Sequence, residues 1–143
     1  MRVMMIVKAD KLSESGALPS EKMLVAMGKL NEEMIKAGVM LAGEGLRPSS
    51  KGTRVTFSGG KPTVKDGPFA ETKELVGGFW ILQVKSMDEA VQWASRVPFD
   101  TGEIEIRQVA EASDFEPVLK TPEGKKVLED EAAFRAKSGM APS

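Results

Sequence analysis

The sequence contains no cysteine, no histidine and no tyrosine among its 143 residues. Without cysteine there is no disulfide, no thiolate nucleophile and no cysteine-ligated metal, which suits a reducing compartment, so we expect a cytoplasmic protein. Without histidine, a zinc site would need carboxylate ligands alone, and the usual proton shuttle near neutral pH is missing. We therefore predict no metal and no cofactor, and acid–base chemistry would have to use a carboxylate or a lysine.

The sequence also lacks an excess of charge and a long apolar run. Its 20 Lys and Arg residues nearly balance 21 Asp and Glu residues, so no strong field attracts nucleic acid or an anionic membrane. The N-terminal apolar run, residues 3 to 7, lies between Arg2 and Lys8 and is too short for a signal sequence or a membrane span. We expect neither nucleic acid nor a membrane as a partner.

Two segments are apolar at successive positions, residues 3 to 7 (VMMIV) and 78 to 84 (GFWILQV). Such runs are typical of central strands that are buried on both faces. Helical spacing of apolar residues and terminal capping signals predict two helices, one introduced by Pro19 and Ser20 and ended by Gly38, the other capped by Ser86 and stopped by Pro98. Residues 39 to 43 and 103 to 109 are predicted to be two further strands.

A hairpin is predicted over residues 53 to 66, with a glycine-rich tip and with Pro62 on an edge strand. Without this insertion, the order is strand, helix, strand, strand, helix, strand. This is the split βαβ or ferredoxin-like plan of the α+β class. At 143 residues the chain has the size of one domain. We place the ferredoxin-like domain at 1–115, and 116–143 is a C-terminal extension with a helix from Thr121 and Pro122 and a frayed end.

Two helices can cover only one face of this sheet, although the central strands are apolar on both. An uncovered second face would expose an unusually large apolar patch. An identical subunit would cover it by packing two sheets face to face, which gives a dimeric α/β barrel. The rival cover is the terminal helix, which could fold back over its own sheet or reach across to the partner.

The stretch DGPFAETKE at 66–74 gathers charged residues around a turn. Asp66 and Glu71 are the candidate catalytic carboxylates, and Lys73 is a candidate substrate-binding residue. The alternative for Asp66 is an Asx turn, in which its carboxylate accepts backbone N–H groups. The alternative for Glu71 and Lys73 is a solvated loop with a weak surface ion pair.

Three more candidates for substrate binding lie outside this stretch. Glu44 and Arg47 flank a glycine-containing turn, where Arg47 could hold a carboxylate or a phosphate; the alternative is a surface turn. Trp80 could stack on a planar ligand, or it could be a core residue of its strand.

The quoted segments together resemble the YCII-related superfamily, in its branch of DGPF-domain proteins. The resemblance runs from Met1 to about Phe115. The matching segments are AGVMLAGEGLRPSSKG at 37–52, GKPTVKDGPFAETKELVGGFW at 60–80, SMDEAVQWASRVP at 86–98 and GEIEIRQV at 102–109. The resemblance implies a ferredoxin-like subunit, a dimeric α/β barrel and a small-molecule cleft near the sheet, and relatives occur beside or fused to sigma factors.

At one position this sequence departs from the pattern of the family that it resembles. Some YCII proteins use a His–Asp pair for proton chemistry, including elimination of chloride from aromatic substrates. In the DGPF branch the residue before Pro-Ser-Ser is often histidine, whereas Arg47 stands there in this sequence. A guanidinium clamps an anion but does not shuttle a proton.

Two hypotheses about function remain open. The first is a lyase- or isomerase-type enzyme that acts on a small anionic or aromatic compound, with Asp66 or Glu71 as base and Arg47 or Lys73 as anion holder. The second is a non-catalytic regulatory or interaction module of a transcription system. Convergence of the candidate residues around one apolar cavity would favour a ligand-binding protein.

Overall fold

The computed structural model describes residues 1–139 and, within them, every side chain except that of Lys73. Its main sheet has four strands in the order β2-β5-β1-β6, and each neighbouring pair is antiparallel. The strands are β1 (Arg2–Lys8), β2 (Met40–Gly45), β5 (Val76–Gln83) and β6 (Ile104–Gln108). This order is that of the split βαβ plan, so the predicted ferredoxin-like α+β fold is confirmed.

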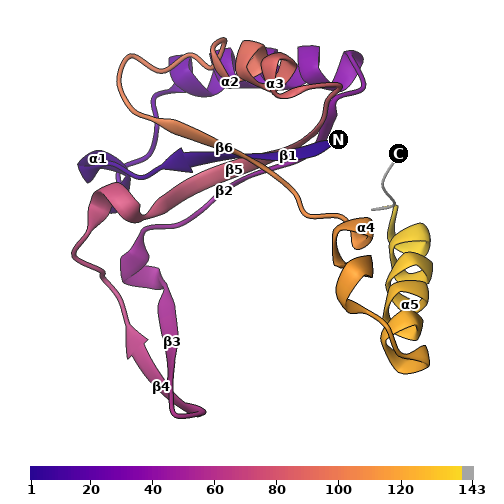
Figure 1. The fold of residues 1–143 in the computed structure, drawn as a ribbon. Coiled ribbons are helices and arrows are strands. Elements are labelled where there is room, and N and C mark those ends of the chain that lie inside the picture. The colour runs from indigo at the N-terminus through magenta and orange to yellow at the C-terminus, as the bar shows by residue number, and fades with distance from the viewer. Residues whose placement is uncertain (140–143) are drawn as a thin grey trace.

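Helices α2 (Glu21–Lys36) and α3 (Met87–Ala94) cover one face of the sheet (Figure 1). Both begin at the predicted serine caps. The Ser20 hydroxyl accepts the N–H of Met23, and the Ser86 hydroxyl accepts the N–H of Glu89. These bonds satisfy backbone donors that have no partner in the first helical turn, and so they determine where each helix begins.

The pairing of β1 with β5 shows which side chains share a face. Val3 is opposite Leu82 and Met5 is opposite Trp80, and all four belong to the buried core beneath the helices. The residues between them alternate to the other side, because successive side chains of a strand point to opposite faces. Met4 pairs with Ile81 and Ile6 with Phe79. We call these four residues the open face.

The predicted hairpin is also confirmed. It consists of β3 (Thr53–Ser58) and β4 (Lys61–Asp66), which pair only with each other. At its tip Gly59 and Gly60 have φ of 57° and 79°, which glycine adopts without strain. Every residue of both strands is exposed, and the hairpin projects from the sheet on the side away from α2 and α3 (Figure 1). We call residues 53–66 the arm.

Several short helical segments were not predicted. They are α1 (Lys11–Glu14), α4 (Ala112–Phe115) and the 3₁₀ turns η1 (Ser49–Lys51), η2 (Thr72–Glu74) and η3 (Glu116–Val118). Segments of three or four residues are too short to show a hydrophobic period, so this signal cannot find them. The predicted terminal helix is α5 (Pro122–Ser138), whose Thr121 cap accepts the N–H of Gly124. The frayed end expected from residue 137 begins inside α5, and residues 140–143 lie outside the described residues.

The terminal helix does not cover the second face of its own sheet. Helices α4 and α5 lie beyond one end of the strands, and α5 extends away on the side opposite α2 and α3 (Figure 1). The alternative in which the chain's own tail folds back over the sheet is therefore wrong. The open-face residues Met4, Ile6, Phe79 and Ile81 are partly exposed and lie outside the core cluster.

Candidate functional site

A cavity of about 670 Å³ opens at the sheet end from which the arm projects. Its walls come from the end of β1, the first half of α2, the glycine-containing end of β2 and the loop before β6. Apolar side chains around it include Leu12, Leu18, Leu24, Met23, Met27 and Phe99. This volume and this apolar lining are those of a small-molecule site.

Trp80 lies at the boundary between this cavity and the core. Its indole Nε1–H donates to the Asn31 side-chain oxygen at 2.9 Å, which joins β5 to α2. A Cβ atom at position 43 would lie 2.8 Å from the Trp80 ring, so only glycine there leaves room for the indole. Trp80 belongs to the core cluster and also lines the cavity. Its predicted core role is therefore observed, and its predicted stacking on a planar ligand stays a prediction.

The charged residues around the cavity are mostly acidic. Asp10, Glu44, Asp100 and Glu103 line it, whereas Lys8 is the basic lining residue among the described side chains. Lys8 lies 3.5 Å from a Glu105 carboxylate oxygen. The Ser13 backbone N–H donates to Asp10 and lowers the pKa of this carboxyl, which keeps it ionised. An anionic ligand would meet repulsion here, whereas a neutral or cationic one would not.

Asp66 and its turn do not line the cavity. The hydrogen bond of Asp66 joins the two strands of the arm. The Asp66 carboxylate accepts a hydrogen bond from the Thr53 hydroxyl at 3.0 Å, across the base of the arm. An Asx turn, the alternative predicted for Asp66, needs backbone N–H donors; the structure has a cross-strand side-chain donor instead. Asp66 is exposed.

Ser49 connects this turn to α1. Its N–H and hydroxyl donate to the two Glu14 carboxylate oxygens at 2.9 and 2.5 Å, and its hydroxyl accepts the N–H of Phe69 at 3.0 Å. A Cβ atom on Gly67 would lie 1.8 Å from the Ser49 carbonyl oxygen. The Asp-Gly-Pro-Phe motif therefore fastens the arm to the body of the subunit.

Two more predicted residues, Arg47 and Glu71, do not line the cavity. Glu71 is exposed at the start of η2, and Arg47 is exposed in the loop between β2 and η1. The side chain of Lys73 lies outside the described residues. Of the five candidates whose side chains are described, Glu44 and Trp80 line the cavity. The catalytic roles predicted for Asp66 and Glu71 stay predictions.

Sequence reasoning missed Asn31 and Asp10. Asp10 carried a usable signal, because Asp10 and Ser13 have the spacing of a capping box, and the structure shows both of its hydrogen bonds. Asn31 follows Leu30 on α2, and a polar residue on a helix gives no sign of a partner 49 residues away.

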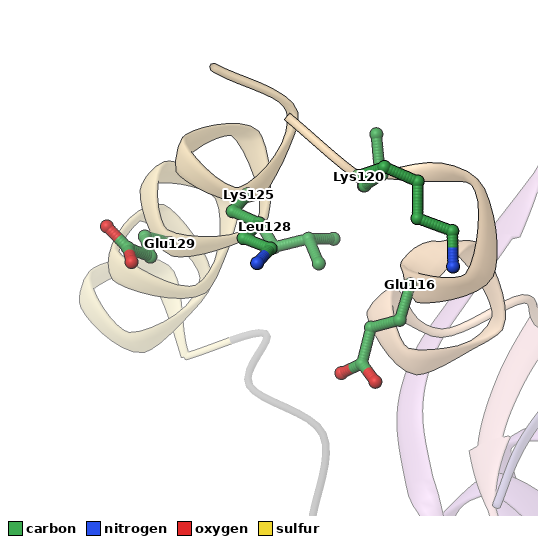
Figure 2. Close-up of a pocket in the computed structure, with 6 residues that line it drawn as sticks. Glu116, Lys120, Lys125, Leu128 and Glu129 are labelled. Atoms are coloured by element: carbon green, nitrogen blue, oxygen red, sulfur yellow. The ribbon is translucent and has the colours of Figure 1, made fainter. Parts of the chain in front are cut away.

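A second hollow, of about 520 Å³, lies between α5 and the segment that includes η3. Figure 2 shows Leu128 pointing from α5 toward the segment that carries Glu116 and Lys120. The charged residues around it are Glu116, Lys120, Lys125 and Glu129. Because these charges balance and the hollow follows the contact between two helical segments, we assign no ligand to it.

Among the described residues, no group of three or more acidic side chains is arranged to hold a metal ion. Within residues 1–139, no helix is long and apolar enough to span a bilayer.

Comparison with known proteins relates the chain to one family. Residues 1–113 match the model of the YCII-related domain. An uncharacterised protein of Rhizobium meliloti (strain 1021) is 32% identical over 93 residues, which cover 63% of this chain and 75% of that protein. A solved structure of 5-chloro-2-hydroxyhydroquinone dehydrochlorinase from Burkholderia phenoliruptrix AC1100, in complex with 2,5-dihydroxybenzoquinone, has a TM-score of 0.42 at 13% identity; the match covers 80% of this chain and 98% of that one.

Proposed function

The chain belongs to the YCII-related domain family, and we propose that it forms a homodimer whose subunits each bind a small aromatic compound in the cavity beside Trp80. The observation that carries the proposal is the cavity itself. It combines about 670 Å³ of space, apolar walls and an indole held in place by Asn31. A fixed aromatic ring at an apolar wall favours planar ligands through stacking.

The charge around the cavity narrows the ligand class. Among the described side chains, four carboxylates and one lysine line it, and Arg47, one of the two predicted anion holders, is not a lining residue. A neutral aromatic compound fits this environment better than an anionic one, because an anion would be repelled by the carboxylates and would lose hydration on entry.

We also propose that the bound compound undergoes a lyase- or isomerase-type reaction. Such a reaction needs a proton acceptor close to the substrate. Glu44 is the predicted site carboxylate that borders the cavity. Because it pairs with Phe79, its side chain lies on the open-face side of the sheet, opposite Trp80, so we propose Glu44 for this role only toward a ligand group that reaches past the edge strand. Asp66 and Glu71 would act only on a ligand bound elsewhere.

The homodimer is supported by the open face. Met4, Ile6, Phe79 and Ile81 form an apolar centre on the sheet face that α2 and α3 do not cover. A second copy would bury this patch by packing sheet against sheet, at the roughly 10 Å spacing typical of such layers.

A non-catalytic regulatory or interaction module is the second candidate function. The observation that favours it is the scatter of Arg47, Asp66 and Glu71, all of them exposed and outside the cavity lining. In that case the open face and the arm serve association, and the cavity has no substrate.

Calorimetric titration with three compounds of similar size tests the ligand proposal: catechol, benzoate and benzylamine, which are neutral, anionic and cationic. We expect catechol to bind and benzoate to bind at least tenfold more weakly. Leu24→Trp should weaken catechol binding at least tenfold, because it fills the mouth of the cavity. Ile35→Trp is the matched control, an exposed residue of the same helix outside the cavity.

Two results would contradict the ligand proposal. One is that none of the three compounds binds, which favours the interaction module. The other is that Leu24→Trp and Ile35→Trp bind catechol equally well, which would place the ligand elsewhere.

A further inference from the structure

Four glycines of the sheet line the cavity. Gly43 and Gly45 belong to β2, and Gly77 and Gly78 belong to β5. Glycine weakens a strand, because it has no side chain to pack and loses more conformational freedom on folding than other residues do. A glycine within a strand therefore needs a reason, which is often the close approach of another backbone or of a ligand.

Packing explains three of these glycines. A Cβ atom on Gly43 would lie 2.8 Å from the Trp80 ring, and one on Gly78 would lie 2.9 Å from a carbonyl oxygen of β2. A Cβ atom on Gly77 would lie 3.4 Å from the Cα atom of Ala9, which leaves little room for a longer side chain. At each of these positions the chain itself occupies the space beside the glycine.

Packing does not explain Gly45. A Cβ atom on this residue would meet no heavy atom within 4 Å, and its φ is not positive. Valine would therefore fit this position of β2 and would favour a strand. Among the described residues, one other glycine, Gly28 in α2, has both properties, and it does not line the cavity.

The space beside Gly45 belongs to the cavity. Gly43 faces Trp80, and Gly45 is two residues further along the strand, so a side chain at position 45 would point to the same face of the sheet. Helix α2 lies over this face (Figure 1). Gly45 pairs with Gly78, which in turn pairs with Val7. Two neighbouring strands therefore present peptide groups without side chains, and we call Gly45 and Gly78 the glycine floor.

We propose that the ring of the aromatic ligand lies on the glycine floor beside Trp80, and that Gly45 is the specificity-determining residue that keeps this place open. The inference rests on the proposed ligand binding and adds the position of the ring within the cavity. A flat ring can approach peptide groups closely, whereas a branched side chain at position 45 would occupy its place. Helix α2 contributes Met23 and Met27 to the cavity wall, and methionine makes favourable contacts with aromatic rings.

Calorimetric titration with catechol and thermal unfolding of the same variants test this inference. Gly45→Val should bind catechol at least tenfold more weakly than the wild type. It should also unfold at the same or a higher temperature, because its side chain enters open space and favours a strand. Gly45→Ala should weaken binding less than Gly45→Val does. The matched control is Gly28→Val, the same change at the other open glycine and outside the cavity lining, which should bind catechol as the wild type does.

Two results would overturn the inference. If Gly45→Val binds catechol within twofold of the wild type, the ring does not lie on the glycine floor. If Gly45→Val unfolds at a clearly lower temperature, the fold itself requires glycine there. Leu24→Trp separates this failure from that of the proposed function. Loss of catechol binding in Leu24→Trp but not in Gly45→Val would leave the ligand in the cavity and off the glycine floor, whereas a wild type that does not bind catechol would refute both proposals.

Discussion

At the residue scale, Gly67 lets the Asp-Gly-Pro-Phe turn pack closely on the loop before β3. Its N–H donates to the Gly52 carbonyl at 3.0 Å, and the Ser49 carbonyl oxygen occupies the space that a side chain would need. Ser49 in turn binds Glu14 and Phe69. The Asp-Gly-Pro-Phe motif therefore has a packing role. The Asp66 carboxylate also stabilises the base of the arm, because it accepts the Thr53 hydroxyl.

Gly67→Ala should lower the free energy of unfolding by about 2–4 kcal/mol, because a methyl group at that position forces two backbone segments apart. The control is Gly28→Ala in α2, where a Cβ atom would meet no heavy atom within 4 Å. This change should stabilise the protein by up to about 1 kcal/mol, since alanine favours a helix. Denaturant unfolding measures both, and wild-type stability of Gly67→Ala would disprove the packing argument.

At the scale of elements, the Arg2–Glu111 ion pair joins the start of α4 to the sheet, just before the C-terminal extension. Arg2 donates to both Glu111 carboxylate oxygens, at 2.7 and 2.8 Å, and Arg2 is only 7% exposed. The guanidinium holds the pKa of Glu111 below its ordinary value, and the carboxylate raises the pKa of Arg2. This pair therefore attaches the segment that leads into the extension, whose helix α5 has no buried side chain.

The attachment should depend on pH. The folded pKa of Glu111 lies below its unfolded value of about 4.3. Its contribution to stability is therefore complete above that value and is lost as pH falls through the lower, folded pKa. We expect Glu111→Gln to lower the free energy of unfolding by about 1.5–3 kcal/mol at neutral pH. This loss should become progressively smaller in acid.

Urea unfolding of both chains at several pH values measures this difference. Asp130→Asn, in an exposed pair with Lys126, is the matched control and should change stability little at any pH. If Glu111→Gln lowers the free energy of unfolding by the same amount at neutral pH and in strong acid, the predicted pH dependence of the Arg2–Glu111 pair is wrong.

At the scale of the whole molecule, the alternation of β5 separates two adjacent aromatic residues. Trp80 is buried under the helices, whereas Phe79 lies on the open face. The same substitution at these positions should therefore have different consequences, one for folding and one for association.

We expect Phe79→Asp to convert the proposed dimer into a less stable, folded monomer, because a charge at the centre of the interface would be desolvated without a partner. Trp80→Asp should prevent folding, since it removes the indole and buries a carboxylate in the core. Light scattering and circular dichroism distinguish the two results. A wild-type protein that is a well-folded monomer would refute the dimer.

The elements of this protein could be predicted from its sequence because their signals are local. Ser20, Ser86 and Thr121 cap helices at the predicted positions, and the two runs of successive apolar residues are the two central strands, β1 and β5. The order of these elements then leaves few ways to build the sheet. Membership of the YCII-related family agrees with the motifs, while the DGPF branch stays a prediction.

The candidate site could be predicted only in part. Glu44 and Trp80 line the cavity, whereas Arg47 and Asp66 do not. Which side chains meet depends on contacts between distant segments, such as Glu14 with Ser49 and Asn31 with Trp80. The sequence by itself thus determined the strands, the helices and a sheet with two apolar faces. The tertiary structure alone decided what the loops hold together, because a loop residue is positioned by packing and not by a local period.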